Sequence, residues 1–187
     1  MSCPSGIIGD ARTSMRGITD AKGWARPMRH ATLKKRAELV DLVIHHYKRA
    51  RYLKNFPKKI VAGVVGLMFP HSNFEGRGFF KEVHSIHSRA RKLVLKLSNA
   101  KSTRRDWKVY QRLPAGIRNR YFAKIYWHTK YCLLQKYGEK VDASKPEVKR
   151  EVKKLRERVK KYGLRDIKTA NVRKVEGRFK IVDANPV

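Results

Sequence analysis

Acidic residues are scarce in this chain, and their scarcity is its most informative property. The 187 residues contain 15 Asp and Glu against 46 Lys and Arg, so the formal net charge is +31. A compact chain with this much positive charge repels itself, and a polyanion that neutralises it would stabilise the folded state. The basic residues run from Arg12 to Lys180. This spread indicates a protein embedded in nucleic acid rather than a neutral domain with a basic tail.

The few acidic residues also limit the chemistry that we expect. They are scattered along the sequence, and no two of them stand out as a general acid and base. A nuclease normally clusters carboxylates around Mg²⁺, and the sequence shows no such cluster. It also has no Walker loop, dinucleotide-binding fingerprint or nucleophile elbow. We therefore expect that the chain is not an enzyme, uses no cofactor and has no small-molecule substrate.

Cysteine is equally rare, because the sequence contains only Cys3 and Cys132. Two cysteines cannot build a disulfide framework or a Cys-rich zinc site, which fits a reducing compartment. His84 and His87 lie three residues apart. No carboxylate or thiol lies at a spacing that would complete a four-ligand site with them. We expect no metal.

Long apolar runs are missing as well. The longest extends from Ile60 to Phe69 and ends at Pro70. A helix that spans a bilayer needs roughly 20 apolar residues. We therefore expect a buried core segment here and no membrane span.

The hydrophobic residues nevertheless make up 41% of the chain, and their spacing predicts an all-α fold. We expect a small bundle of four to five basic amphipathic helices with extended N- and C-terminal arms. The predicted organisation is a basic arm over 1–31, a helical domain over 32–163 and a C-terminal tail over 164–187. Two short apolar segments flank Glu176-Gly177 in this tail and favour a β-hairpin.

Five segments carry the helical pattern. We predict helices over 32–53, 79–99, 101–113, 115–137 and 144–163. Gly138 is predicted to cap the fourth helix, and Ser144 with Glu147 to form a capping box at the start of the last. The last helix also carries a heptad seam with Leu155 at its middle.

The segment from Lys101 to Tyr137 carries the strongest functional pattern, because basic and aromatic residues alternate along it. Lys and Arg neutralise phosphates, and aromatic rings stack on unpaired bases. We expect Trp107 and Tyr110 to supply such stacking. The predicted RNA-binding residues on this segment and its neighbours are Lys48, Arg49, Arg51, Lys58, Lys59, Arg89, Arg91, Arg104, Arg105, Trp107, Lys108, Tyr110, Arg112, Arg118, Arg120, Lys154 and Arg158.

Short basic amphipathic helices, aromatic clusters and long arms together make the chain resemble ribosomal proteins as a class. The Arg-rich N-terminus and the Trp and Tyr content are similar to those of a mitochondrial, lineage-specific ribosomal protein. This resemblance implies a structural constituent of the ribosome in the mitochondrial matrix. Its partners would be ribosomal RNA and neighbouring ribosomal proteins. A cytoplasmic or plastid ribosome is the alternative location.

A second resemblance implies a different function. His46-Tyr47-Lys48, followed by Arg51 and Phe56, is similar to the motif of the LYR family, small mitochondrial three-helix proteins that bind acyl carrier protein. The alternative is therefore a mitochondrial assembly factor or LYR-like adaptor that binds a protein partner. DNA binding is less favoured, since a helix-turn-helix requires a compact three-helix unit. An RNA-processing enzyme would need a carboxylate or metal centre.

Overall fold

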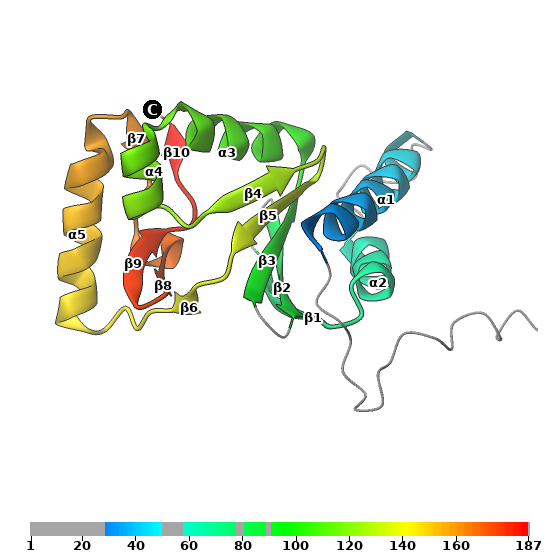
Figure 1. Cartoon of the computed structure of the whole chain (residues 1–187), viewed down its shortest axis with the longest axis horizontal. Helices are drawn as coiled ribbons and strands as arrows, with labels where there is room; N and C mark the ends of the chain where they lie inside the picture. The colour runs from blue at the N-terminus through cyan, green and yellow to red at the C-terminus, as the bar shows by residue number, and fades with distance from the viewer. Residues whose placement is uncertain (1–28, 50–57, 78–80, 89–90, 187) are drawn as a thin grey trace, which may run out of the picture.

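The computed structural model describes residues 29–49, 58–77, 81–88 and 91–186, and the fold is mixed α/β (Figure 1). The prediction of an all-α fold is therefore wrong. The helices are α1 (His30–Arg49), α2 (Lys58–Met68), α3 (Ala100–Arg112), α4 (Ala115–Tyr121), α5 (Pro146–Lys160) and the 3-10 helix η2 (Thr169–Asn171). The strands are β1 (Ser72–Arg77), β2 (Lys81–Ser88), β3 (Arg91–Ser98), β4 (Ile125–His128), β5 (Cys132–Lys136), β6 (Glu139–Lys140), β7 (Leu164–Arg165), β8 (Val172–Val175), β9 (Arg178–Ile181) and β10 (Asn185–Pro186). Residues 1–28 of the predicted N-terminal arm lie outside the described residues.

The centre of the fold is a five-stranded antiparallel sheet with the strand order β1-β2-β3-β5-β4. A three-stranded sheet, β6-β8-β9, and the pair β7-β10 lie toward the C-terminal end of the chain. In Figure 1, α1 and α2 lie beside the strands at one end of the molecule, and α5 lies at the other. The helix α3 runs between these ends, along the edge formed by β4.

Within the segment predicted as a helix over 79–99, the described residues form the antiparallel strands β2 and β3 instead. Strand β3 is central, and both of its faces are covered, so its residues from Leu93 to Ser98 are all buried. A strand of this kind has a nearly continuous apolar sequence. Such a short run cannot be distinguished from a buried helix by periodicity. This ambiguity explains the error.

The helix predicted over 115–137 ends after only two turns. The chain continues as β4 and β5, whose aromatic and apolar residues suit a half-buried pleated surface. The turn between these strands is held by Asp41 of α1, which accepts hydrogen bonds from the backbone N–H groups of Lys130 (2.6 Å) and Tyr131 (3.0 Å). A contact between residues so distant in sequence leaves no local pattern.

The first of two buried clusters joins α1 and α2 to the five-stranded sheet. Leu33, Val40 and Ile44 of α1 pack with Val65 of α2 and Leu95 of β3. The prediction of a helix over 32–53 is confirmed over the described residues of α1. One face of the apolar run lies in the core, through Val61, Val65 and Phe69, whereas Leu67 on its other face is exposed. In the described part of the chain, no helix combines the length and apolar character needed to cross a membrane.

The second cluster places the predicted seam of α5 against α3, α4 and the C-terminal segment. Val148, Val152, Leu155 and Val159 are buried, as the heptad pattern predicted. The predicted capping box is wrong, because Lys145 precedes the helix without a side-chain cap. The amide and hydroxyl of Ser144 donate instead to Asp142.

The C-terminal segment is not the extended arm that we predicted. Leu164, Ile167, Val172 and Ile181 are buried in the second cluster. The hairpin prediction is confirmed by the pairing of β8 with β9. Glu176 and Gly177 both have positive φ values (49° and 76°), as the tightest hairpin turns require.

Gly138 is not a helix cap, which corrects a further prediction. It follows β5, and a Cβ atom built at this position would lie 2.5 Å from the Cβ of Arg173 and 2.8 Å from Val175 Cγ2. Only a residue without a side chain allows the two segments to approach this closely.

Candidate functional site

A cavity of about 420 Å³ lies between the five-stranded sheet and the C-terminal segment. Strands β1, β2 and β3 contribute Gly76, Lys81 and Lys96 to its lining, and the connection after β5 contributes Tyr137 and Gly138. The far side is formed by residues of the C-terminal segment, namely Ala170, Asn171, Arg173, Val182 and Asp183. We call this cavity the cleft.

Two lysines and two aspartates form a largely buried charge cluster at the cleft. Lys81 Nζ lies 2.7 Å from Asp106 Oδ2 and 2.8 Å from Asp183 Oδ1. Lys96 is 8% exposed, and its Nζ donates to the backbone carbonyl of Val182 at 2.5 Å. The cluster therefore joins β2, β3 and α3 to Asp183, which lies two residues after the end of β9.

The pKa values of the cluster are shifted by burial and by charge. Burial alone would lower the pKa of Lys81, but the carboxylates of Asp183 and Asp106 outweigh it and raise this pKa. Burial lowers the pKa of Lys96 more strongly than Asp183 can raise it. Burial raises the pKa of Asp106. At Asp183, burial is the largest single influence, yet the ammonium groups of Lys96 and Lys81 together hold its pKa below the usual value. Two cations near one carboxylate keep Asp183 ionised.

A short polar loop lies next to the cleft, between β7 and β8. Asp166 has a φ of 62°, in the left-handed region that non-glycine residues seldom adopt. Its carbonyl accepts a hydrogen bond from Asn171 Nδ2 (2.8 Å), and its Oδ2 accepts one from Asn185 Nδ2 (3.1 Å). Lys168 Nζ lies 3.0 Å from Asp166 Oδ1. The Asp166 side chain is therefore partly exposed to solvent, and its carboxylate is held in one orientation by Asn185 and Lys168.

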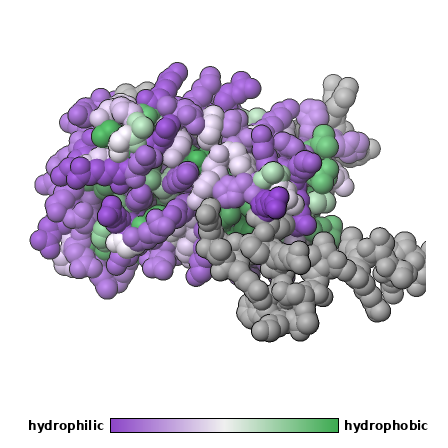
Figure 2. Space-filling view, viewed as in Figure 1, coloured by the Kyte–Doolittle hydropathy of each residue, from purple (hydrophilic) through white to green (hydrophobic). Residues whose placement is uncertain are grey.

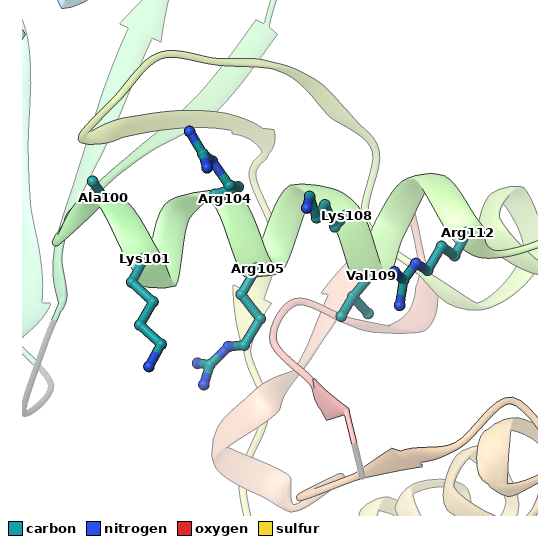
Figure 3. Close-up of a pocket in the computed structure, with 7 residues that line it drawn as sticks. All are labelled: Ala100, Lys101, Arg104, Arg105, Lys108, Val109 and Arg112. Atoms are coloured by element: carbon teal, nitrogen blue, oxygen red, sulfur yellow. The ribbon is translucent and has the colours of Figure 1, made fainter.

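A groove of about 480 Å³ lies along α3, separate from the cleft. In Figure 3, Lys101 and Arg105 extend from one side of the helix and Arg104 from the other. The described residues that line this groove are Ala100, Lys101, Arg104, Arg105, Lys108, Val109 and Arg112. Four of these were predicted as RNA-binding residues, and their side chains are exposed.

Contacts between side chains connect α3 with α4 and α5. Arg118 of α4 donates to Gln111 of α3 at 3.2 Å, and its guanidinium lies 5.1 Å from the ring centre of Tyr110. Arg158 of α5 donates to the hydroxyl of Tyr121 at 2.8 Å. Arg120 stacks on the same ring at 5.4 Å. Figure 2 shows hydrophilic residues over most of the visible face at this end of the molecule.

The structure brings some of the predicted RNA-binding residues together and not others. Tyr110 is buried in the second cluster, and Trp107 is half-buried beside it, with the two ring centres 6.4 Å apart. Lys154 is exposed on α5 and forms an ion pair with Glu151. Arg51 and Arg89 lie outside the described residues. Only the backbone is described at Lys48, Arg49, Lys58, Lys59 and Arg91.

Sequence reasoning missed the residues of the cleft. The charges of Lys81, Lys96, Asp166 and Asp183 are dispersed along the sequence, no two of these carboxylates are neighbours, and Asn171 carries no charge at all. The usable pattern is one of order and spacing. It begins with Lys96 in an apolar strand sequence. Arg165-Asp166 comes next, with Asn171 five residues after Asp166, and Asp183 follows shortly after the hairpin of β8 and β9.

Comparison with known proteins leaves the family of this chain open. No family model matches the sequence, and no curated protein matches it. The chain is similar to the one in the crystal structure of Rad53 1–466 in complex with AMP-PNP, with 16% sequence identity and a TM-score of 0.42. This match covers 68% of the chain and 43% of the other, so the chain spans less than half the length of that protein. A likeness of this strength supports no functional inference.

Proposed function

We propose that the cleft binds the phosphates of a nucleotide and that the chain transfers the terminal phosphoryl group. The observation that carries the proposal is the placement of Lys96, Asn171 and Asp183 around one cavity, with Asp166 beside it. The same residue types occur in the same order in the protein-kinase signature. There, a strand lysine contacts phosphates, an Arg-Asp loop supplies the base and an Asn, and a later Asp contacts the metal ion.

Several positions agree with this signature and several depart from it. Arg165-Asp166 and Asn171 have its spacing, while Leu164 occupies the position of its histidine. Asp183-Ala184-Asn185 stands where the signature has Asp-Phe-Gly. In the glycine-rich segment, Gly76 and Gly78 agree, and Lys81 replaces the third glycine. The proposal therefore depends on the polar groups of the cleft rather than on identity with every motif residue.

The oxygen donors at the cleft fit a magnesium ion that is shared with phosphates. Within the described residues, no group of three or more His, Cys, Asp or Glu side chains could hold a metal ion by itself. Protein Mg²⁺ sites commonly use one or two carboxylates together with substrate phosphates. Asp183 and the side-chain oxygen of Asn171 would supply such ligands. A bound ion would neutralise charge on the phosphates.

The chain's own groups would act at defined atoms. Lys96 is fixed by its bond to Val182, and its ammonium would contact phosphate oxygens. The Asp166 carboxylate, oriented by Asn185 and Lys168, would accept the proton of an acceptor hydroxyl. The proposal departs from our expectation that the chain is not an enzyme. No observation tests that expectation, and the experiment below decides between the two.

The test is titration of the purified full chain with a fluorescent ATP analogue in the presence of Mg²⁺. Each charge-assisted contact is worth about 1.5–3 kcal/mol, so Lys96→Met and Asp183→Asn should each weaken binding by about 10- to 100-fold. The matched control is Lys101→Met, an exposed lysine on α3 outside the cleft. Asp166→Asn should retain binding and abolish transfer or hydrolysis of the γ-phosphate. A wild-type chain that binds no nucleotide, or a Lys96→Met variant that binds like wild type, would refute the proposal.

Binding of structured RNA is a second proposed function, favoured by the connected basic surface of α3, α4 and α5. The side chains of Arg104, Lys108, Arg120 and Arg158 are exposed on these helices. A surface of this kind gathers phosphates without reading sequence. Its predicted role in a ribosome, as a constituent or as an assembly factor, is tested by sedimentation of the tagged chain. Co-migration with mature particles supports a constituent, migration only with precursors supports an assembly factor, and migration with neither refutes both roles.

A further inference from the structure

Lys81 occupies an unexpected place in the charge cluster. It is the first residue of β2, yet its ammonium bridges two carboxylates from distant segments, Asp106 on α3 and Asp183 after β9. Its side chain is 15% exposed. A buried ammonium is stable only when it is paired and hydrogen-bonded, and Lys81 meets both conditions.

Lys96 is hydrogen-bonded as well, but the partner of its ammonium is not a carboxylate. Its ammonium is also buried, but the bond to Val182 is to a neutral carbonyl. An ammonium has three donors, and Val182 takes one of them. Lys96 lies opposite Val83 in the pairing of β2 with β3, so Lys81, two residues before Val83, shares its face of the sheet. The two lysines therefore reach the same cleft from adjacent strands.

The acid on α3 is hydrogen-bonded to one of these two lysines. In the kinase signature, the lysine of the strand pairs with an acid on the helix as well as with phosphates. Here the helix that follows β3 offers Asp106, and the hydrogen bond to it comes from Lys81. Because Lys81 already neutralises Asp106, Lys96 has no need to turn toward α3.

We propose that Lys81 is a positioning residue that takes over the pairing with Asp106 and thereby leaves Lys96 to bind the phosphates of the ligand. This inference rests on the proposed nucleotide function for the role of Lys96. The partnership of Lys81 with Asp106 can be tested without any ligand. The position of the third glycine in the glycine-rich pattern is occupied by the lysine that makes this pairing.

The first experiment is a double-mutant cycle on thermal unfolding of the full chain without nucleotide. Lys81→Met and Asp106→Asn should each lower the melting temperature by a few degrees, and together by little more than the larger single effect. Asp106→Asn combined with Lys96→Met should give nearly additive shifts. Lys101→Met is the control on α3 and should leave the melting temperature unchanged. If Lys81→Met does not fold, Lys81→Gln, which keeps a hydrogen-bond donor, is used in its place. Coupling of Asp106 to Lys96 rather than to Lys81 would overturn the inference.

The second experiment measures the affinity for the fluorescent ATP analogue as a function of pH. Lys96→Met should lose about tenfold or more in affinity. Lys81→Met, measured below its melting temperature, should also lose affinity, because Asp106 is left unpaired and draws the Lys96 ammonium away from the phosphates. Adding Asp106→Asn to Lys81→Met should bring the affinity back to within about threefold of wild type. The charged groups that face Lys96 are Asp183, Lys81, Asp106 and Arg173. Removing the positive charge of Lys81 raises the pKa of Lys96, so the loss of affinity at high pH should move to higher pH in Lys81→Met. Recovery of affinity by Asp106→Asn is the readout that a purely structural lysine would not give.

The two proposals fail in distinguishable ways. A loss of affinity in Lys81→Met that Asp106→Asn does not recover overturns the division of roles while nucleotide binding stands. A wild-type chain that binds no nucleotide refutes the proposed function and the phosphate role of Lys96. In that case the double-mutant cycle alone decides the partnership of Lys81 with Asp106.

Discussion

Replacing Gly138 by alanine probes the close approach between the connection after β5 and strand β8. The new Cβ would lie 2.5 Å from Arg173 Cβ and 2.8 Å from Val175 Cγ2. Neither neighbour is the free end of a flexible side chain, so the backbone of one segment must shift. The φ of Gly138 is not in the left-handed region, so the cost of the substitution is steric rather than conformational.

The expected magnitude follows from two opposing effects. Overpacking of this kind costs about 1–3 kcal/mol. Alanine also restricts the unfolded chain, which returns about 0.4–1 kcal/mol. The net loss of unfolding free energy should be about 1–2 kcal/mol. With a urea m-value of about 1–3 kcal/mol/M, the midpoint of urea denaturation should fall by roughly 1 M.

The matched control is Gly63→Ala in the interior of α2. No atom lies within 4 Å of a Cβ built at Gly63, and the residue is exposed. Alanine in a helix interior is favoured over glycine by about 0.5–1 kcal/mol, so this variant should raise the midpoint. Opposite signs for two identical chemical changes would support the steric reasoning. A midpoint for Gly138→Ala at or above that of wild type would refute it.

Three further predictions concern the second cluster, the cleft and the basic surface. Leu155→Asp buries a charge in the seam of α5 and should lower the unfolding free energy by several kcal/mol in urea denaturation, whereas Leu155→Met should cost less than about 1.5 kcal/mol; equal losses would show that the seam is not packed. The pKa of Asp183 is lowered in the folded state, so its stabilising contribution is complete above the unfolded pKa of about 3.9 and is lost as the pH falls through the lower folded value. Asp183→Asn should flatten this acid limb in melting curves, and an unchanged limb would contradict the assignment. Reversing Arg104 and Lys108 to Glu should weaken RNA binding and make the salt slope shallower by roughly 1.8, at roughly 0.9 for each phosphate contact, in filter-binding titrations; an unchanged slope would place the RNA contacts elsewhere.

The elements that could be predicted are those whose own sequence determines their packing. Helix α5 has a single narrow apolar stripe, so the burial of Leu155 follows from its spacing alone. Helix α3 and the turn at Glu176-Gly177 likewise show local patterns of residues that the structure confirms. Basic exposed faces on these helices could also be anticipated, because cations rarely lie in a core.

The sheet and the cleft could not be predicted in the same way. The run from Leu93 to Leu97 is equally consistent with a buried helix and a central strand, and only its neighbours β2 and β5 decide between them. The cleft joins Lys81 to Asp183 across 102 residues of sequence. Charges that pair over such distances look like ordinary solvated residues until the chain is folded.

The position of β3 in the middle of the sheet has a consequence for amide hydrogen exchange. Both neighbours of β3 are hydrogen-bonded strands and both of its faces are buried, so its amides should exchange only when the domain opens globally. Strands β1 and β4, at the sheet edges, should open through smaller fluctuations. Lys96 is therefore attached to the slowest-exchanging segment, whereas Lys81 begins a strand. The ammonium of Lys96 is thus carried by a segment whose backbone stays hydrogen-bonded until the domain unfolds as a whole.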